Sequence, residues 1–100
     1  MLFAILGIDR PDGLPQRLAL RAVHKSYYAQ IADRIAFGGP LLKEDHETMM
    51  GSLTVVDFPD RTSLEEWLKD EPFTKEGVYA SVTLYPFENL SKQMVGFPKA

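Results

Sequence analysis

The chain has 100 residues, of which 45% are hydrophobic, and this length supports one globular domain with a single core. A net charge of −3 without any basic run argues against nucleic acid as a partner. The absence of cysteine excludes disulfides and a thiol nucleophile and agrees with a reducing compartment. The opening MLFAILGI is too short to cross a membrane and lacks a basic n-region, so we expect a cytoplasmic protein with no membrane partner.

The start of the chain predicts a strand followed by a long helix. Residues 2–8 are nearly all apolar and precede the turn-forming residues 9–13, which is typical of a buried strand and a loop. A helical period then runs from residue 14 to about residue 36. Pro15 fits this helix because proline is tolerated in the first turn.

The middle of the chain predicts a β-hairpin. Residues 35–42 contain two adjacent glycines and a proline, which favour a bulged or kinked strand over a helix. Residues 43–48 are polar and read as a loop, and residues 49–58 read as a second short strand. We therefore expect these two strands to pair.

The remaining segment predicts a second helix and a last strand. The run Thr-Ser-Leu-Glu at residues 62–65 matches a capping box, and the helix should end near Glu71, because the residue before a proline disfavours the helical region. Residues 73–77 are expected to form a turn. Apolar and polar or aromatic residues alternate over residues 78–87, as in a strand.

The resulting order β-α-β-β-α-β is that of a ferredoxin-like α+β fold, with two helices on one face of a four-stranded antiparallel sheet. The uncovered face would be too apolar for a small monomer, so we expect a homodimer that buries it. The tail of this single domain, residues 87–100, could clasp the second copy. The residues expected on the uncovered face are Phe3, Ile5, Tyr79, Tyr85 and Phe87.

His24 is the strongest candidate for chemistry, since it is the only histidine inside a strongly periodic apolar segment. In helical projection it lies about 20° from Ile31, on the face that is expected to contact the sheet. An imidazole there is either a packed core residue or a working acid or base. The other residues predicted on this face are Leu20, Val23 and Tyr27.

Arg17, Arg21 and Tyr28 are predicted to line the same edge of the helix as His24. Two guanidinium groups at this edge could bind an anionic substrate, although arginines at the edge of a helix are also common on ordinary surfaces. A phenol could orient a substrate hydroxyl or simply pack at the rim. We treat the three as candidate substrate-binding residues.

The chain resembles the YciI-like (YCII-related) family over nearly its whole length. The matching pieces are the opening apolar strand, the histidine in RAVHKSYY, the GGPL turn at residues 38–41, and the block WLKDEPFTKEGVY before a strand that ends in YPF. The resemblance implies a ferredoxin-like subunit, a dimer of α+β-barrel type and a histidine–acid active-site pair. One branch of the family resembles a cofactor-independent dehydrochlorinase of a hydroxylated aromatic ring.

The resemblance also assigns candidate catalytic residues. The histidine of the pair corresponds to His24, and the family's acid stands immediately before Pro-Phe or Pro-Tyr, a place that Glu71 occupies here. Asp70 is one residue earlier and is an equal candidate from the sequence. A carboxylate beside an imidazole fixes its tautomer and stabilises its charged form, which makes a sensible general acid–base unit.

Two further patterns lie in and beside the predicted hairpin. His46 stands among three acidic residues, but neighbouring side chains in a loop rarely converge on one ion, so we predict no metal. Gly38 and Gly39 complete no phosphate-binding motif, and their expected use is a close approach of backbone to a ligand. Gly39 and Pro40 are therefore also candidate substrate-binding residues.

The sequence is compatible with two functions. The first is a small cofactor-independent lyase or isomerase that moves a proton of a compact, aromatic or lactone-like substrate. The second is a non-catalytic module that binds a small molecule or a protein, because this fold does not fix function. An imidazole bonded to a carboxylate and open to a cavity would favour the enzyme, whereas an imidazole sealed by apolar atoms would favour the module.

Overall fold

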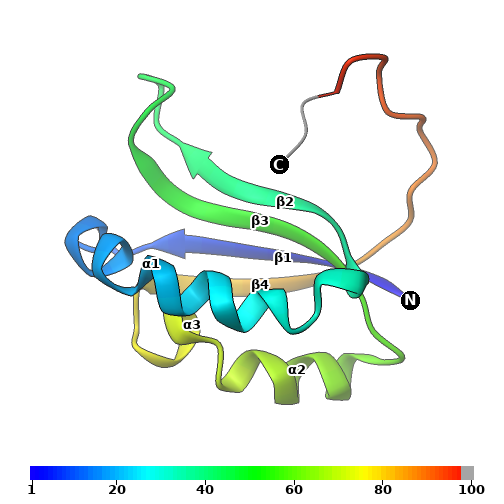
Figure 1. Ribbon diagram of the computed structural model, residues 1–100, viewed down its shortest axis with the longest axis horizontal. Helices are drawn as coiled ribbons and strands as arrows, with labels where there is room; N and C mark the ends of the chain where they lie inside the picture. Colours follow the sequence, from blue (N-terminus) through cyan, green and yellow to red (C-terminus); the bar gives the residue numbers. More distant parts are fainter. Residues whose placement is uncertain (98–100) are drawn as a thin grey trace.

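The computed structural model describes residues 1–97 and confirms the ferredoxin-like α+β fold. Its four strands form one antiparallel sheet in the order β2-β3-β1-β4. The helices lie together below this sheet in Figure 1. The strands are β1 (Leu2–Asp9), β2 (Ile35–Leu42), β3 (Met49–Asp57) and β4 (Tyr79–Phe87), and the helices are α1 (Leu14–Ala29), η1 (Ala32–Arg34, a 3₁₀ turn), α2 (Arg61–Lys69) and α3 (Pro72–Lys75).

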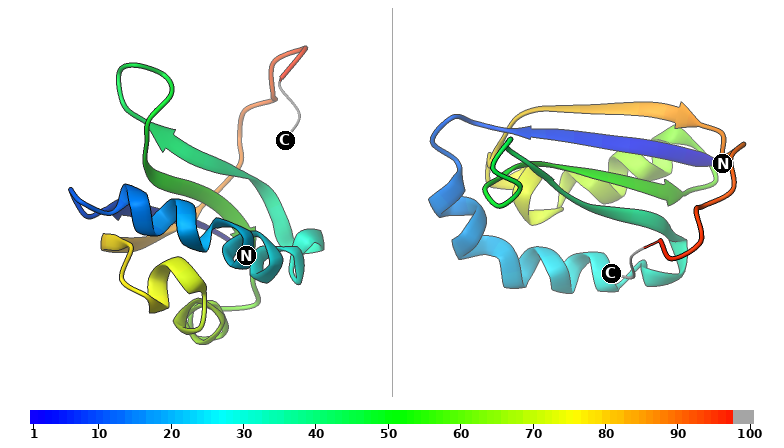
Figure 2. Two further views of the ribbon diagram at one scale, coloured as in Figure 1. Left: turned by 60° about the vertical axis from the view of Figure 1, so that its left-hand side comes forward. Right: turned by 90° about the horizontal axis from the view of Figure 1, so that it is seen from above.

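The first helix is shorter than its apolar period suggests. Helix α1 ends at Ala29, and the backbone N–H of Gln30 is shared between two carbonyls of the last turn. The predicted extension to residue 36 was wrong, because Ile35 already pairs with Val56 of β3. The hairpin of β2 and β3 is confirmed, and Figure 2 shows it extending beyond the helices.

The N-cap of the second helix lies two residues earlier than predicted, and the helix is followed by an additional helical turn. Asp60, not Thr62, is the N-cap of α2, since its carboxylate accepts the backbone N–H of Ser63 at 2.8 Å. The segment expected to be a plain turn forms α3, whose N-cap is Glu71. This cap places a carboxylate in the interior of the protein.

The core lies between the sheet and the helices, and it corrects two orientations predicted from the sequence. Phe3 and Ile5 face the helices and not the open side. Both faces of β1 are apolar, so alternation alone could not decide between them. Val23 is exposed, and the inner side of α1 is formed by Arg17, Leu20, His24 and Tyr28, with Ile31 just beyond the helix.

The face of the sheet away from the helices is apolar, as predicted, and Tyr85 and Phe87 lie on it as expected, whereas Phe3, Ile5 and Tyr79 do not. Tyr85 is 55% exposed, and Phe87 lies near Phe37 of the edge strand with ring centroids 6.3 Å apart. Tyr79 was placed on this face wrongly, because a bulge between Ile8 and Asp9 shifts its register. The alternate residues of β1 on this face are Leu2, Ala4, Leu6 and Ile8.

Residues 88–97 leave the end of β4 and extend away from α2 and α3 (Figure 1). Their apolar side chains are exposed, including Leu90, Met94 and Val95. The last part of the predicted clasp, residues 98–100, lies outside the described residues. None of the helices described for residues 1–97 has the length and apolar character needed to cross a bilayer.

Candidate functional site

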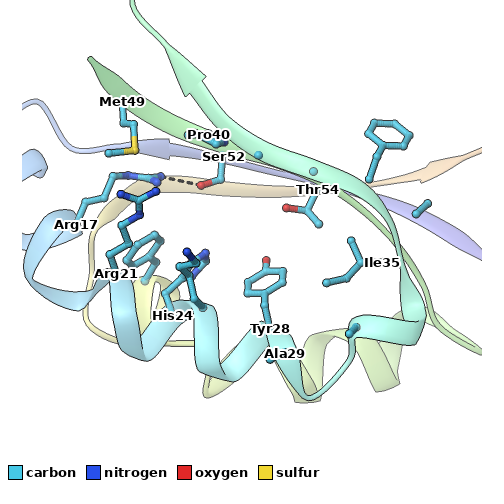
Figure 3. Close-up of a pocket in the computed structure, with 17 residues that line it drawn as sticks. Arg17, Arg21, His24, Tyr28, Ala29, Ile35, Pro40, Met49, Ser52 and Thr54 are labelled. Atoms are coloured by element: carbon cyan, nitrogen blue, oxygen red, sulfur yellow. Dashed lines mark hydrogen bonds between the residues drawn. The ribbon is translucent and has the colours of Figure 1, made fainter. Parts of the chain in front are cut away.

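A cavity of about 550 Å³ lies between α1 and the hairpin of β2 and β3 (Figure 3). The inner side of α1 forms one wall, and polar residues of β3 face it from the sheet. All the candidate binding residues predicted from the sequence line this cavity, namely Arg17, Arg21, Tyr28, Gly39 and Pro40, and so does His24.

His24 is bonded to a fully buried carboxylate. Its Nδ1 atom lies 2.9 Å from Oε2 of Glu71, whose side chain is 0% exposed, while the His24 side chain remains 18% exposed. When Glu71 is ionised its carboxylate can only accept, and the hydrogen between the two atoms then sits on Nδ1. In the neutral imidazole this leaves Nε2 as the atom with a free lone pair.

Glu71 reaches this position because of the sequence Glu-Pro-Phe. Its backbone is extended before Pro72, and its carboxylate caps α3 by accepting the backbone N–H of Phe73 at 2.8 Å. The hydroxyl of Thr74 donates to the other carboxylate oxygen at 3.3 Å. The cap and the contact with His24 therefore share one buried group.

The two acids predicted as equal partners are separated by the structure. Asp70 is exposed and follows the last turn of α2, where its backbone serves as the C-cap. Glu71 is the acid that contacts His24. An acidic residue at the C-terminus of a helix is unfavourable, because the helix dipole places partial negative charge there. Glu71 instead stands at the N-terminus of α3, where a carboxylate is favourable.

Two aromatic rings fix the imidazole plane. Phe73 stacks on His24 with ring centroids 3.8 Å apart and an interplanar angle of 7°. Tyr28 contacts the same imidazole at a tilt of 50°, with ring centroids 4.7 Å apart. Burial, followed by the charge of Glu71, raises the pKa of Tyr28 well above its usual range. Tyr28 therefore stays a neutral phenol that can donate a hydrogen bond into the cavity.

Arg17 belongs to a buried polar network at one end of the cavity. Its guanidinium makes a two-point ion pair with Asp9, at 2.7 and 3.0 Å, and the two side chains are 4% and 5% exposed. The Nη2 atom also donates to the Ser52 hydroxyl at 2.7 Å. The guanidinium lies 4.7 Å from the centre of the Phe73 ring. It is therefore held rigidly, as buried charges require.

Tyr79 completes this network from β4. Its hydroxyl donates to Ser52 at 3.0 Å, and burial raises its pKa to about 12. The ring crosses β1 at Gly7, where any Cβ would lie 2.7 Å from ring atoms of Tyr79. Glycine at this place is what allows the ring to reach Ser52.

The glycine pair and His46, also singled out in the sequence, have different places in the structure. Gly38 is the glycine that the packing requires, since a Cβ would lie 2.8 Å from Thr54, whereas a Cβ on Gly39 would meet nothing within 4 Å. His46 lies in the hairpin loop with a φ of 61° and does not line the cavity. Within residues 1–97 no group of three potential metal-binding side chains converges.

Sequence reasoning missed the sheet side of this site. Asp9 was read as part of a turn, and Ser52 and Thr54 as members of an ordinary strand. Their sequence signal is weak, because polar residues on a strand reveal a site only when the register shows which face they share. Ser52 lies opposite Gly7 and Thr54 lies opposite Ile5, both on the helix side of the sheet.

The family model of the YCII-related domain matches residues 1–88. The chain belongs to the YCII-related family. An uncharacterized protein from Haemophilus influenzae is 29% identical to this YCII-related chain over 97 residues, covering 90% of it and 99% of the relative. Protein YciI from Escherichia coli O6:H1 is 27% identical over the same extent.

Two solved structures share the fold of this YCII-related protein. One is 5-chloro-2-hydroxyhydroquinone dehydrochlorinase from Burkholderia phenoliruptrix AC1100, in complex with 2,5-dihydroxybenzoquinone. It is 29% identical, has a TM-score of 0.82, and the match covers 88% of this chain and 94% of that one. An antibiotic biosynthesis monooxygenase matches in fold alone, with 15% identity, a TM-score of 0.55 and coverage of 91% and 100%.

Proposed function

We propose that this YCII-related protein is a small-molecule enzyme in which His24 transfers a proton and Glu71 orients the imidazole. The observation that carries the proposal is the hydrogen bond between His24 and the buried Glu71, on an imidazole that lines a cavity. A histidine sealed by apolar atoms would have favoured a binding module instead. Nothing in this arrangement needs a cofactor to move a proton.

The roles of His24 and Glu71 follow from the free lone pair on Nε2 of the imidazole. Nε2 of His24 takes a proton from the substrate, and the carboxylate of Glu71 stabilises the imidazolium that results. Stacking on Phe73 keeps the ring from rotating between steps. The same nitrogen can return the proton to another atom of the substrate, which gives an isomerisation or supports the departure of a leaving group.

The substrate class is a compact, hydroxylated ring, aromatic or lactone-like. A cavity of about 550 Å³ is in the range of small-molecule sites. Its walls are mainly apolar, with a few polar groups that converge on one side. The dehydrochlorinase with the same fold supports a lyase or isomerase type of reaction on such a ring.

Turnover assays test this proposal. The protein is incubated in D₂O with 5-chloro-2-hydroxyhydroquinone, related hydroquinones and small unsaturated lactones, and NMR follows elimination, isomerisation and exchange at carbon. We expect His24→Ala to lower the rate by roughly 100-fold or more, as the loss of a general base does. Asp70→Asn is the matched control and should retain activity. Binding without turnover would instead indicate a binding module, and turnover unchanged in His24→Ala would exclude His24 as the base.

We also propose that two copies pair through the open face of the sheet. This face carries Tyr85 and Phe87 with the outward residues of β1, an apolar surface that water disfavours. The exposed apolar residues of the tail, such as Leu90 and Val95, can cover a second copy.

A further inference from the structure

We propose that the cavity selects organic anions, with the anionic oxygen bound by the Ser52 hydroxyl and the Arg21 guanidinium and the apolar body directed towards Tyr28 and Ile35. The inference rests on the proposed function in using the same cavity. It adds a direction of binding and a chemical class, namely a carboxylate, phenolate or enolate on a compact apolar frame.

The hydroxyl of Ser52 can donate one hydrogen bond to a ligand in the cavity. Its oxygen accepts from Nη2 of Arg17 at 2.7 Å and from the hydroxyl of Tyr79 at 3.0 Å. A hydroxyl oxygen has two lone pairs and one proton, so both acceptor positions are occupied. Among residues 1–97 no group accepts the remaining proton of Ser52. This proton is therefore available to an acceptor atom in the cavity, which Ser52 lines.

The charged side chains that line the cavity are all basic. Three cations line the cavity, Arg17, Arg21 and Lys25, and none of its lining residues, all within residues 1–97, is Asp or Glu. This composition is opposite in sign to the chain, whose net charge is −3. The acids that neutralise Arg17 and contact His24 stand behind them, outside the lining. An anionic ligand thus contacts no acidic side chain of the lining, and Arg17 and His24 stand between it and these two carboxylates.

The cavity is polar at one end and less polar at the other. In Figure 3, Arg17, Arg21 and Ser52 lie towards one end, and Tyr28 and Ile35 lie towards the other. Arg17 is already held by Asp9 and Ser52, so its part is to polarise and orient the Ser52 hydroxyl. Arg21 is exposed on α1 and is free to reach the ligand as a fork of donors. His24 lies between the two ends. In the proposed direction of binding, its imidazole is beside the body of the ligand.

Paired probes test this inference by binding alone. Benzoate is compared with its neutral isostere benzamide, and 4-nitrophenolate with 4-nitroanisole, by NMR titration of the full chain at low ionic strength. We expect the anion of at least one pair to bind roughly tenfold tighter than its neutral counterpart, the size of one charge-assisted hydrogen bond. The pair that shows the preference distinguishes a carboxylate site from a phenolate or enolate site.

Variants then locate the preference. Arg21→Gln and Ser52→Ala should each reduce it about tenfold, whereas the controls Lys69→Gln and Ser26→Ala, both on exposed helix surfaces, should leave it unchanged. Tyr79→Phe covers the case in which Ser52→Ala does not fold. It keeps the hydroxyl of Ser52 but removes the hydrogen bond that Tyr79 donates to it, so one acceptor position of Ser52 becomes free. This variant should also weaken the preference for anions.

Equal affinity for anions and neutral isosteres, or no binding by any probe at millimolar concentration, would overturn the inference. His24→Ala should keep the anion preference, since its nitrogen is not the anion's partner. If the wild type shows no preference for anions but its turnover depends on His24, only this inference is removed. If the wild type prefers anions but shows no turnover that depends on His24, only the proposed function is removed.

Discussion

Oε2 of Glu71 accepts two hydrogen bonds, one from Nδ1 of His24 at 2.9 Å and one from the backbone N–H of Phe73 at 2.8 Å. The orientation of the imidazole is therefore coupled to the first turn of α3. Phe73 itself stacks on the ring that this carboxylate holds. Three consecutive residues, Glu-Pro-Phe, thus supply the carboxylate, its extended backbone and the stacking partner of His24.

The buried ion pair at the end of the cavity should be essential for stability. Asp9→Asn leaves the guanidinium of Arg17 buried without its countercharge, and we expect the free energy of unfolding to fall by roughly 3 kcal/mol. Asp12→Asn, an exposed position in the following turn, should change it little. Urea unfolding measures both, and equal stabilities of the two variants would contradict this role of Asp9.

The two adjacent glycines should respond differently to alanine. A Cβ on Gly38 would lie 2.8 Å from Thr54 and 3.1 Å from the carbonyl oxygen of Leu53, so Gly38→Ala should lower stability by roughly 1–3 kcal/mol. Gly39→Ala meets open space and should leave stability unchanged or slightly raised, because alanine restricts the unfolded chain. Denaturant midpoints that rank the two variants in the opposite order would be incompatible with this packing.

Stability should fall at alkaline pH through Tyr79. Its pKa is raised from 10.0 to about 12, mainly by burial, so the folded state holds the phenol proton more tightly than the unfolded state. The stabilisation is complete below pH 10 and is lost as the pH rises to 12. Tyr79→Phe should reduce the slope of unfolding free energy against pH in this window by up to about 1.4 kcal/mol per unit. An unchanged slope would show that the phenol titrates alike in both states.

The open face of the sheet should bring two copies together. Tyr85→Lys places a charge on this apolar face and should shift the protein to monomers at micromolar concentration in sedimentation equilibrium, as should truncation after Asn89 to a lesser degree. Val23→Lys, an equally exposed apolar position on α1, is the control and should leave the dimer intact. A wild-type monomer at this concentration would remove the dimer proposal.

The sequence predicted the order of the four strands and the two longer helices, and one side of the site, since these depend on local periodicity. His24 and Tyr28 were placed correctly because they recur at helical spacing along α1. Glu71 was an equal candidate with Asp70 because one residue of difference decides which acid turns inward, and that depends on where α2 stops and α3 begins.

The sheet side could not be predicted from the pattern. Both faces of β1 are apolar, so the choice of face for Phe3 and Ile5 depended on packing that alternation does not specify. The position of Tyr79 depends on a bulge in the pairing of β1 with β4. Ser52 acquires its role only when Arg17 and Tyr79 arrive from distant parts of the chain.

The most direct test of the central claim is the tautomer of His24, measured by ¹⁵N NMR of the imidazole at a pH well above neutrality. We predict a proton on Nδ1, hydrogen-bonded to Glu71, and an unprotonated Nε2 open to the cavity. Glu71→Gln should alter this spectrum, and Asp70→Asn should not, because only Glu71 contacts the ring. A proton on Nε2 in the wild type, or a spectrum unaffected by Glu71→Gln, would contradict His24 as a base held by Glu71.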